Sequence, residues 1–194
     1  MPTVISHPVV ALGLFPWLRR ELGRPAVLVI GMLLTVLPDL DIVGFKLGIP
    51  YGHLLGHRGL SHSLVFALVV GGLAALAVAR AYRLRPAVLW LYFFLCLASH
   101  GLLDALTGGG LGIAFFSPFS NERYFFDVRP LRVSAIGLSD FLASRWSAVL
   151  ASELKWVWLP ALALGAAGAV AGRLARRVAD RAQGVAPEGI SDRQ

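Results

Sequence analysis

The stretch PAVLWLYFFLCLASHGLLDAL covers residues 86–106 and carries no charged side chain before Asp104. As a helix it would extend about 31 Å, which is close to the thickness of the hydrocarbon core of a bilayer. Three other apolar stretches of the same length occupy residues 25–45, 60–80 and 153–173. These four stretches predict an all-α, polytopic membrane helix bundle.

The composition supports a membrane protein and excludes several functional classes. Hydrophobic residues make up 57% of the chain and charged residues 15%, and the mean hydropathy of +0.70 is too high for a soluble domain of 194 residues. The single cysteine, Cys96, excludes a disulfide framework and a thiolate metal cluster. The net charge of +7 comes from arginines beside the apolar stretches and not from a basic face interleaved with aromatic residues, so no nucleic-acid partner is expected.

The arginines predict the topology. They lie after a shorter apolar stretch at residues 6–18, between the second and third long stretches, and after the last one. If residues 6–18 cross the membrane as a short first helix, the positive-inside rule places all three arginine groups in the cytoplasm. The alternative for residues 6–18 is an interfacial helix. We therefore expect one integral membrane domain of about five helices, residues 1–181, followed by a flexible cytoplasmic tail, residues 182–194.

The histidines and several aspartates fall at the ends of the apolar stretches that this topology places outside. Charged and imidazole groups are expensive in a membrane, so they mark candidate functional sites. The candidate metal ligands are His7, Asp39, Asp41, His57, His62, His100 and Asp104. Because these residues come from distant parts of the chain and meet at one membrane depth, the sequence predicts a metal site that faces the periplasm or the exterior.

The spacing of the aspartates suits coordination of an ion. His100 and Asp104 lie four residues apart, so on a helix they share a face. Asp39 and Asp41 follow Pro38, where a helix kinks or ends. The two carboxylates can serve different partners, or one ion and a supporting histidine.

The two histidines at the start of the second long stretch suit coordination only with a break in the helix. His57 and His62 lie five residues apart, so His57 is expected in the loop, with the break at Gly59 and Ser61 capping the helix that follows. His53 lies in a glycine-rich loop without an acidic partner and is expected to be solvated. Imidazole nitrogens with carboxylate oxygens fit zinc, manganese or iron better than calcium, and they leave open positions for water.

Four short runs carry a resemblance to a known family: PDLD at 38–41, HRGLSHS at 57–63, HGLLD at 100–104 and SPFS at 117–120. They resemble the YdjM-type inner-membrane proteins, a bacterial family linked to LexA regulation and described as metal-dependent hydrolases. The resemblance covers most of the chain, residues 7–153. It implies a protein of the bacterial inner membrane.

That family is distantly similar to the zinc-dependent phospholipase C and P1 nuclease group. In that group an Asp, a His and a His-x-x-x-Asp pair surround one zinc, and an N-terminal His helps to hold a second. The resemblance implies that the pair corresponds to His100 and Asp104, the single Asp to Asp39 or Asp41, the middle His to His57 or His62, and the N-terminal His to His7. No histidine follows His100, so one or two ions are expected and a trinuclear site is not.

The predicted function is a metal-dependent hydrolase that cleaves a phosphoester of a lipid or lipid-linked substrate with metal-activated water. The catalytic candidates are Asp39, Asp41, Arg58 and Ser61, and the candidate phosphate ligands are Arg58, Ser63, Ser120 and Arg123. The long aromatic connection 107–152 is expected to fold over the site, partly as helices. Two rivals stay open: a metal-ion or proton transporter, and a non-enzymatic membrane scaffold with a structural metal.

Overall fold

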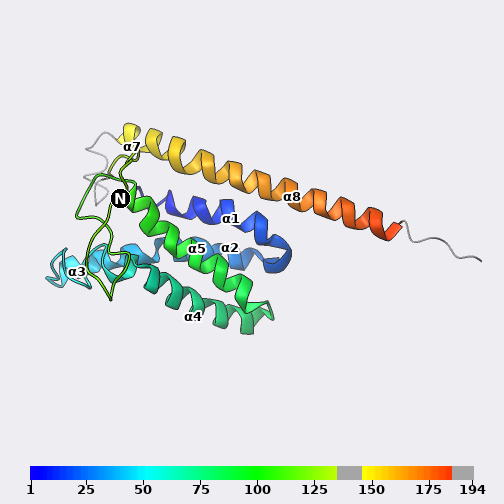
Figure 1. Ribbon diagram of the computed structural model, residues 1–194, viewed down its shortest axis with the longest axis horizontal. Coiled ribbons are helices and arrows are strands. Elements are labelled where there is room, and N and C mark those ends of the chain that lie inside the picture. The colour runs from blue at the N-terminus through cyan, green and yellow to red at the C-terminus, as the bar shows by residue number, and fades with distance from the viewer. Residues whose placement is uncertain (135–145, 185–194) are drawn as a thin grey trace, which may run out of the picture.

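The computed structural model describes residues 1–134 and 146–184, and these residues form a helix bundle (Figure 1). Its five longest helices are α1 (His7–Leu22), α2 (Pro25–Val36), α4 (Leu64–Tyr82), α5 (Pro86–Ala105) and α8 (Leu159–Gly184). The shorter elements are η1 (Leu37–Ile42), α3 (Val43–Lys46), η2 (Leu60–His62), α7 (Trp146–Glu153) and η3 (Leu154–Trp158). The predicted all-α architecture is confirmed.

Four helical segments are long and apolar enough to cross a membrane: Pro25–Lys46, Leu64–Tyr82, Pro86–Ala105 and Trp146–Arg181. They contain or closely match the four predicted stretches. Large apolar side chains on their outer faces are exposed, for example Leu33 at 66% and Leu73 at 64%, as expected where lipid replaces water. α1 is the fifth, shorter helix, with 16 residues and a length of about 24 Å.

Prolines and one serine set where the helices begin. Pro8, Pro25 and Pro86 occupy the first turn of α1, α2 and α5, where the missing N–H would have no helical partner. At α4 the Oγ of Ser63 accepts a hydrogen bond from the backbone N–H of Phe66 at 3.0 Å. The expectation that Ser61 caps this helix is wrong, because η2 comes first and the Ser61 side chain belongs to the candidate site.

α5 is the central helix, and it contacts α1, α2 and α4. Its buried face carries large side chains that fill the bundle, including Leu89, Tyr92 and Phe93. The Tyr92 ring occupies space that a side chain on α2 would need, since a Cβ on Gly31 would lie 2.5 Å from its hydroxyl. The Tyr92 hydroxyl donates to the carbonyl oxygen of Ala11 at 3.3 Å, which ties α5 to α1.

α8 runs alongside α1 in the same direction and packs closely against it (Figure 1). A Cβ on Gly13 would lie 2.4 Å from the carbonyl oxygen of Ala161, and one on Gly165 would lie 3.3 Å from the Gly13 Cα. One turn further on, Trp17 covers Gly168 and donates from Nε1 to the carbonyl oxygen of Leu164 at 2.9 Å. Small residues thus permit a close helix approach, as in other membrane bundles.

The connection after α5 closes over the end of the bundle that carries α3. Residues 106–134 form two isolated bridges, Thr107 with Leu131 and Ile113 with Tyr124. Backbone hydrogen bonds join Ala114 to Arg58 at 3.1 Å and Phe115 to Leu64 at 3.0 Å. Among the described residues of this connection the helical part is α7, and α8 reaches past the predicted boundary at 181. The rest of the connection, residues 135–145, and the tail residues 185–194 lie outside the described residues.

The close contact between α1 and α8 predicts a stability difference between two glycine variants. Gly13→Ala places a methyl group into the Ala161 backbone and should lower the free energy of unfolding by about 1–3 kcal/mol. Gly172→Ala is the matched control, because a Cβ there meets nothing within 4 Å. Thermal unfolding of the detergent-purified variants measures the difference, and equal midpoints would contradict this packing.

Candidate metal centre

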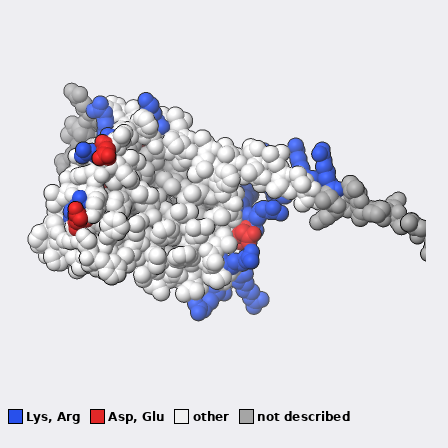
Figure 2. Space-filling model, in the orientation of Figure 1, with Lys and Arg blue, Asp and Glu red and all other residues white. Residues whose placement is uncertain are grey.

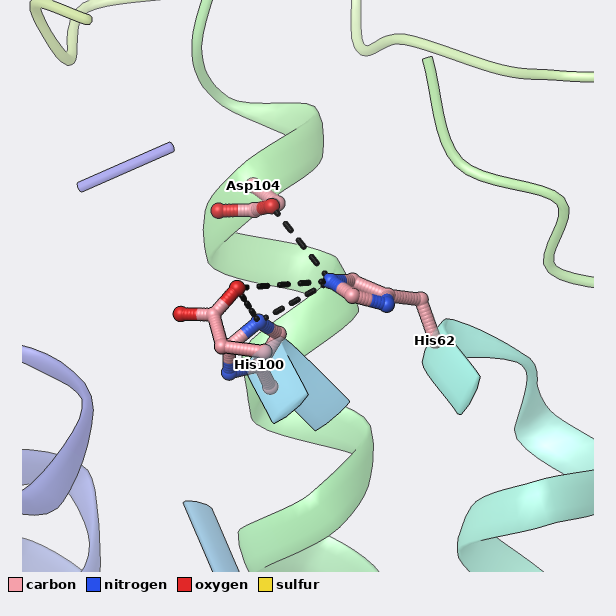
Figure 3. Close-up of side chains that lie close together, drawn as sticks. His62, His100 and Asp104 are labelled. Atoms are coloured by element: carbon pink, nitrogen blue, oxygen red, sulfur yellow. Dashed lines mark hydrogen bonds and ion pairs between the residues drawn. The ribbon is translucent and has the colours of Figure 1, made fainter. Parts of the chain in front are cut away.

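Four buried side chains, Asp39, His62, His100 and Asp104, meet at one end of the bundle. Asp39 lies on η1 after α2, His62 lies on η2 before α4, and the other two lie one turn apart on α5. Their ligand atoms all fall within 4.8 Å of one another. Figure 3 shows His62 reaching from a separate element toward His100 and Asp104 on their helix. The predicted shared face of His100 and Asp104 is present.

The distances between ligand atoms fit a single small cation. The Nε2 atoms of His62 and His100 are 3.1 Å apart, and Asp39 Oδ1 lies 3.3 Å from His100 Nε2. His62 Nε2 lies 3.7 Å from Asp104 Oδ2 and 3.9 Å from Asp39 Oδ1. Bonds of about 2.0–2.1 Å from a tetrahedral zinc would place neighbouring ligand atoms about 3.3 Å apart. Small shifts of these side chains would therefore suffice to hold an ion.

Hydrogen bonds to the far nitrogens fix the orientation of the two imidazoles. His100 Nδ1 lies 2.7 Å from the carbonyl oxygen of Thr35, so it donates its proton there. His62 Nδ1 lies 2.9 Å from Ser61 Oγ and 3.1 Å from Asp41 Oδ2, and the Ser61 hydroxyl donates to the same carboxylate. Burial lowers the pKa of His62 below its usual value, which favours the neutral ring. With the two Nδ1 atoms held in this way, both Nε2 atoms face one point, where each would offer a lone pair to a bound metal.

The centre contains more negative than positive charge. Both carboxylate oxygens of Asp39 and both of Asp104 are buried without a hydrogen-bond partner. The Nε of Arg58 lies 2.9 Å from Asp104 Oδ2. One guanidinium can offset only one of the two carboxylates, and an uncompensated buried charge is costly. The unpaired oxygens and the inward lone pairs therefore suit a divalent cation.

Asp41, His57 and His62 form a second group of close ligand atoms. Asp41 Oδ1 lies 2.7 Å from His57 Nδ1, and Oδ2 accepts from Ser61 Oγ at 2.5 Å and from the Arg58 backbone N–H at 3.1 Å. These are direct hydrogen-bond lengths, so this group leaves less room for an ion than the first. The two aspartates thus serve different partners: Asp39 faces the four-residue cluster and Asp41 orients His62.

His7 reaches the cluster from the start of α1. Its ring is fully buried and stacks on His100, with 3.9 Å between the ring centroids and 14° between the planes. Its Nε2 lies 3.9 Å from Asp104 Oδ1, and neither ring nitrogen has a hydrogen-bond partner. The structure therefore places His7 beside the cluster, where Asp104 connects it to the other ligand atoms.

A tightly wound loop brings His57 and Arg58 to the site. Arg58 has φ +62°, and a Cβ on Gly59 would lie 2.3 Å from the carbonyl oxygen of Leu54. This glycine therefore permits the break in the helix that the sequence predicts there. The Arg58 side chain is 1% exposed and also donates to Gly109 O and, at 3.4 Å, to Thr107 Oγ1.

The other predicted phosphate ligands have partners of their own. Arg123 donates to backbone carbonyls of the neighbouring loop, at 3.0 Å to Tyr51 and 3.1 Å to His57. Ser63 caps α4, and Ser120 Oγ accepts from the Glu122 backbone N–H at 3.2 Å. Each of these side chains organises the loops around the cluster.

Three contributors were missed in the sequence. Thr35 supplies a carbonyl oxygen and Tyr51 packs edge-on against His57 at 5.3 Å, and neither has a sequence signal of its own. Glu153 is fully buried and accepts from Thr3 and Ser6, which ties the N-terminal segment to the end of α7. A single acid at the start of the last apolar stretch was the signal that could have identified it. His53 is exposed, as expected.

Asp41→Asn tests the orienting role of the second group. The amide keeps the size of the side chain but weakens its hold on His62 Nδ1, so metal affinity should fall about 10- to 100-fold. Competition with a chelator of known affinity measures the change on the detergent-purified protein. His53→Ala is the control and should keep the parent affinity. An unchanged affinity in Asp41→Asn would contradict this role.

The comparisons with known proteins agree with the helical membrane bundle. The family model described as YdjM inner membrane protein matches residues 1–178. The inner membrane protein YbcI of Escherichia coli strain K12 is 41% identical over 164 residues, which cover 84% of this chain and 95% of that relative. No solved structure matches. The chain that builds this buried His and Asp cluster therefore belongs to the YdjM family of inner membrane proteins.

Proposed function

We propose that the protein is a membrane-embedded, metal-dependent hydrolase that cleaves a phosphoester of a lipid or lipid-linked substrate. The observation that carries this proposal is the convergence of Asp39, His62, His100 and Asp104, whose buried donor atoms face one point. By the positive-inside rule, the arginines at the opposite end of the bundle favour a site that faces the periplasm. The end of the bundle that carries the cluster would then lie at the outer leaflet.

The donor set of two imidazoles and two carboxylates suits zinc best, with manganese or iron as alternatives. The four-residue cluster would hold one ion, and His7 with the free Oδ1 side of Asp104 is the place where a second could be held. When bound, such an ion acts as a Lewis acid and makes water a nucleophile at neutral pH.

The remaining residues divide the other tasks of hydrolysis. Asp39 Oδ2 has no hydrogen-bond partner and can accept a proton from the attacking water. Asp41 and Ser61 hold His62 in the required tautomer. The guanidinium of Arg58 lies behind Asp104 and adds positive charge beside the place where a phosphoryl oxygen would develop negative charge.

The surface around the cluster supports a lipid substrate. Large apolar side chains are exposed on the loops at this end, among them Leu47 at 73%, Phe116 at 52% and Phe119 at 87%. Exposed aromatic and aliphatic side chains at a membrane boundary can enter the headgroup region. A substrate that approaches the cluster from the bilayer would therefore meet an apolar surface that accepts its acyl chains.

The transporter alternative has less support. Within the described residues, the buried polar side chains gather at the cluster end, whereas the buried side chains toward the arginine end include Leu22, Val27 and Leu89. An ion or proton path across the bundle would require polar groups to continue through this region.

A structural metal in a non-enzymatic scaffold is the second candidate function. It is favoured by the number of protein ligands and by their burial, because a site with four protein ligands is typical of structural zinc. Catalysis would require one carboxylate to detach from the metal, so that water can take its position. Asp104, which Arg58 already neutralises in part, is the residue placed to detach. The coordination number of the bound metal separates the two functions.

His100→Ala tests the proposed hydrolase. The variant loses one imidazole ligand and the contact to Asp39, so it should lose its metal and at least about a thousandfold of the activity on phospholipids or lipid-linked phosphates. Elemental analysis and phosphate or headgroup release measure the two effects on the same preparation. His53→Ala is the control and should keep both.

Two results would contradict the hydrolase. Full activity in His100→Ala would exclude this metal centre as its source. The structural scaffold would be identified instead by three results together: stoichiometric metal, a spectrum of the cobalt-substituted protein that shows four protein ligands, and no turnover of any phosphoester tested.

A further inference from the structure

The end of the bundle opposite the candidate metal centre contains a basic cleft between α1 and α8. Its volume is about 520 Å³. Four arginines line it: Arg19 and Arg20 in the last turn of α1, and Arg173 and Arg176 on α8. Figure 2 shows Lys and Arg side chains gathered at this end of the molecule. The hydrolase proposed above makes no use of this cleft.

The backbone and small residues keep the cleft open. α1 ends at Leu22, and the capping residue Gly23, with a φ of +45°, turns the chain away, whereas α8 continues to Gly184. Between the two helices the Trp17 ring fills the space beside Gly168, where a Cβ would lie 2.7 Å from the indole. One turn further on, a Cβ on Gly172 would meet nothing within 4 Å, so the gap between the helices is unfilled there.

The arginines of the cleft lack acidic partners. Within residues 1–134 and 146–184, the ion pair found at this end joins Arg85 to Glu21 at 3.5 Å, and none of the four cleft arginines has a carboxylate within 4.0 Å. All four side chains are exposed. Guanidinium groups that line one cleft without a counter-charge repel one another and attract a phosphate, which they can bind in bidentate fashion.

The surroundings indicate a lipid phosphate in preference to a soluble anion. The cleft lies near the end of the apolar segment Trp146–Arg181, where the bilayer surface is expected. On the bilayer side of the cleft the Trp17 ring is 50% exposed beside Gly168, so an acyl chain can lie against the indole below a bound headgroup. Basic pockets between membrane helices bind anionic lipid headgroups in this way.

We propose that this cleft is a binding site for an anionic phospholipid, with Arg19 and Arg20 on one wall and Arg173 and Arg176 on the other holding its phosphates. Two pairs of arginines on two helices match a lipid with two phosphates better than a lipid with one. The expected order of affinity is therefore cardiolipin, then phosphatidylglycerol, with the zwitterionic phosphatidylethanolamine weakest.

Native mass spectrometry of the full-length, detergent-purified protein tests the site. The protein is titrated with each of the three lipids and, separately, with inorganic phosphate. The double variant Arg173→Gln/Arg176→Gln should bind cardiolipin about tenfold more weakly or worse. The double variant Arg80→Gln/Arg83→Gln removes the same charge from another connection and should bind as the parent does. Gly172→Leu keeps every charge but fills the cleft, and it should weaken cardiolipin binding to a similar extent.

The pattern of results decides the proposal. If the two double variants lose cardiolipin affinity equally, the lipid is attracted to the overall positive charge of the protein and the proposed site is wrong. Unchanged cardiolipin binding in Arg173→Gln/Arg176→Gln would also contradict the site. Unchanged binding in Gly172→Leu would place the lipid elsewhere. Inorganic phosphate that binds as tightly as cardiolipin would overturn the lipid assignment. The thermal unfolding midpoint of each variant should match that of the parent, which shows that the bundle has folded.

Discussion

The constraint on which the structure depends is the burial of two carboxylates in an apolar helix bundle. Asp39 and Asp104 would each be costly alone, because their carboxylate oxygens are buried and make no hydrogen bond with the described residues. They are tolerated because Arg58 and the imidazoles of His62 and His100 lie around them and because the arrangement can take up a cation. The interruption of the helix after α2, the loop before α4 and the start of α1 all bring polar groups to this one place.

α5 gives the site its rigidity. Two of the four cluster residues lie on this helix, and its apolar face fills the centre of the bundle. His100 is further fixed by Thr35 O on α2 and by the stacked ring of His7 on α1. A shift of α1 or α2 against α5 would therefore displace the imidazole of His100, so helix packing and the geometry of the four-residue cluster are coupled.

The sequence predicted the apolar helices and the depth of the polar residues, because both follow from length, hydropathy and the arginine distribution. It also predicted that His100 and Asp104 share a face, since helical periodicity determines this. It did not decide which of Asp39 and Asp41, or which of His57 and His62, would be the metal ligand. That choice depends on the backbone of η1 and η2 and on the positive φ of Arg58. This backbone brings Asp41 to His57 and brings His62 into the cluster. The same irregular backbone moved the helix cap from Ser61 to Ser63, and the long-range contact from Thr35 has no local signal.

α1 is the element that links the two ends of the molecule. His7 at its start touches the cluster, whereas Arg19 and Arg20 at its end line the basic cleft. Between them, Gly13 and Trp17 fix α1 against α8, and Tyr92 fixes it against α5. Because these contacts lie along one short helix, an anionic lipid that draws the ends of α1 and α8 together would act on the same helix that carries His7. The small residues of the α1–α8 contact therefore matter for the cluster and for the cleft, although their side chains contact neither a metal nor a lipid.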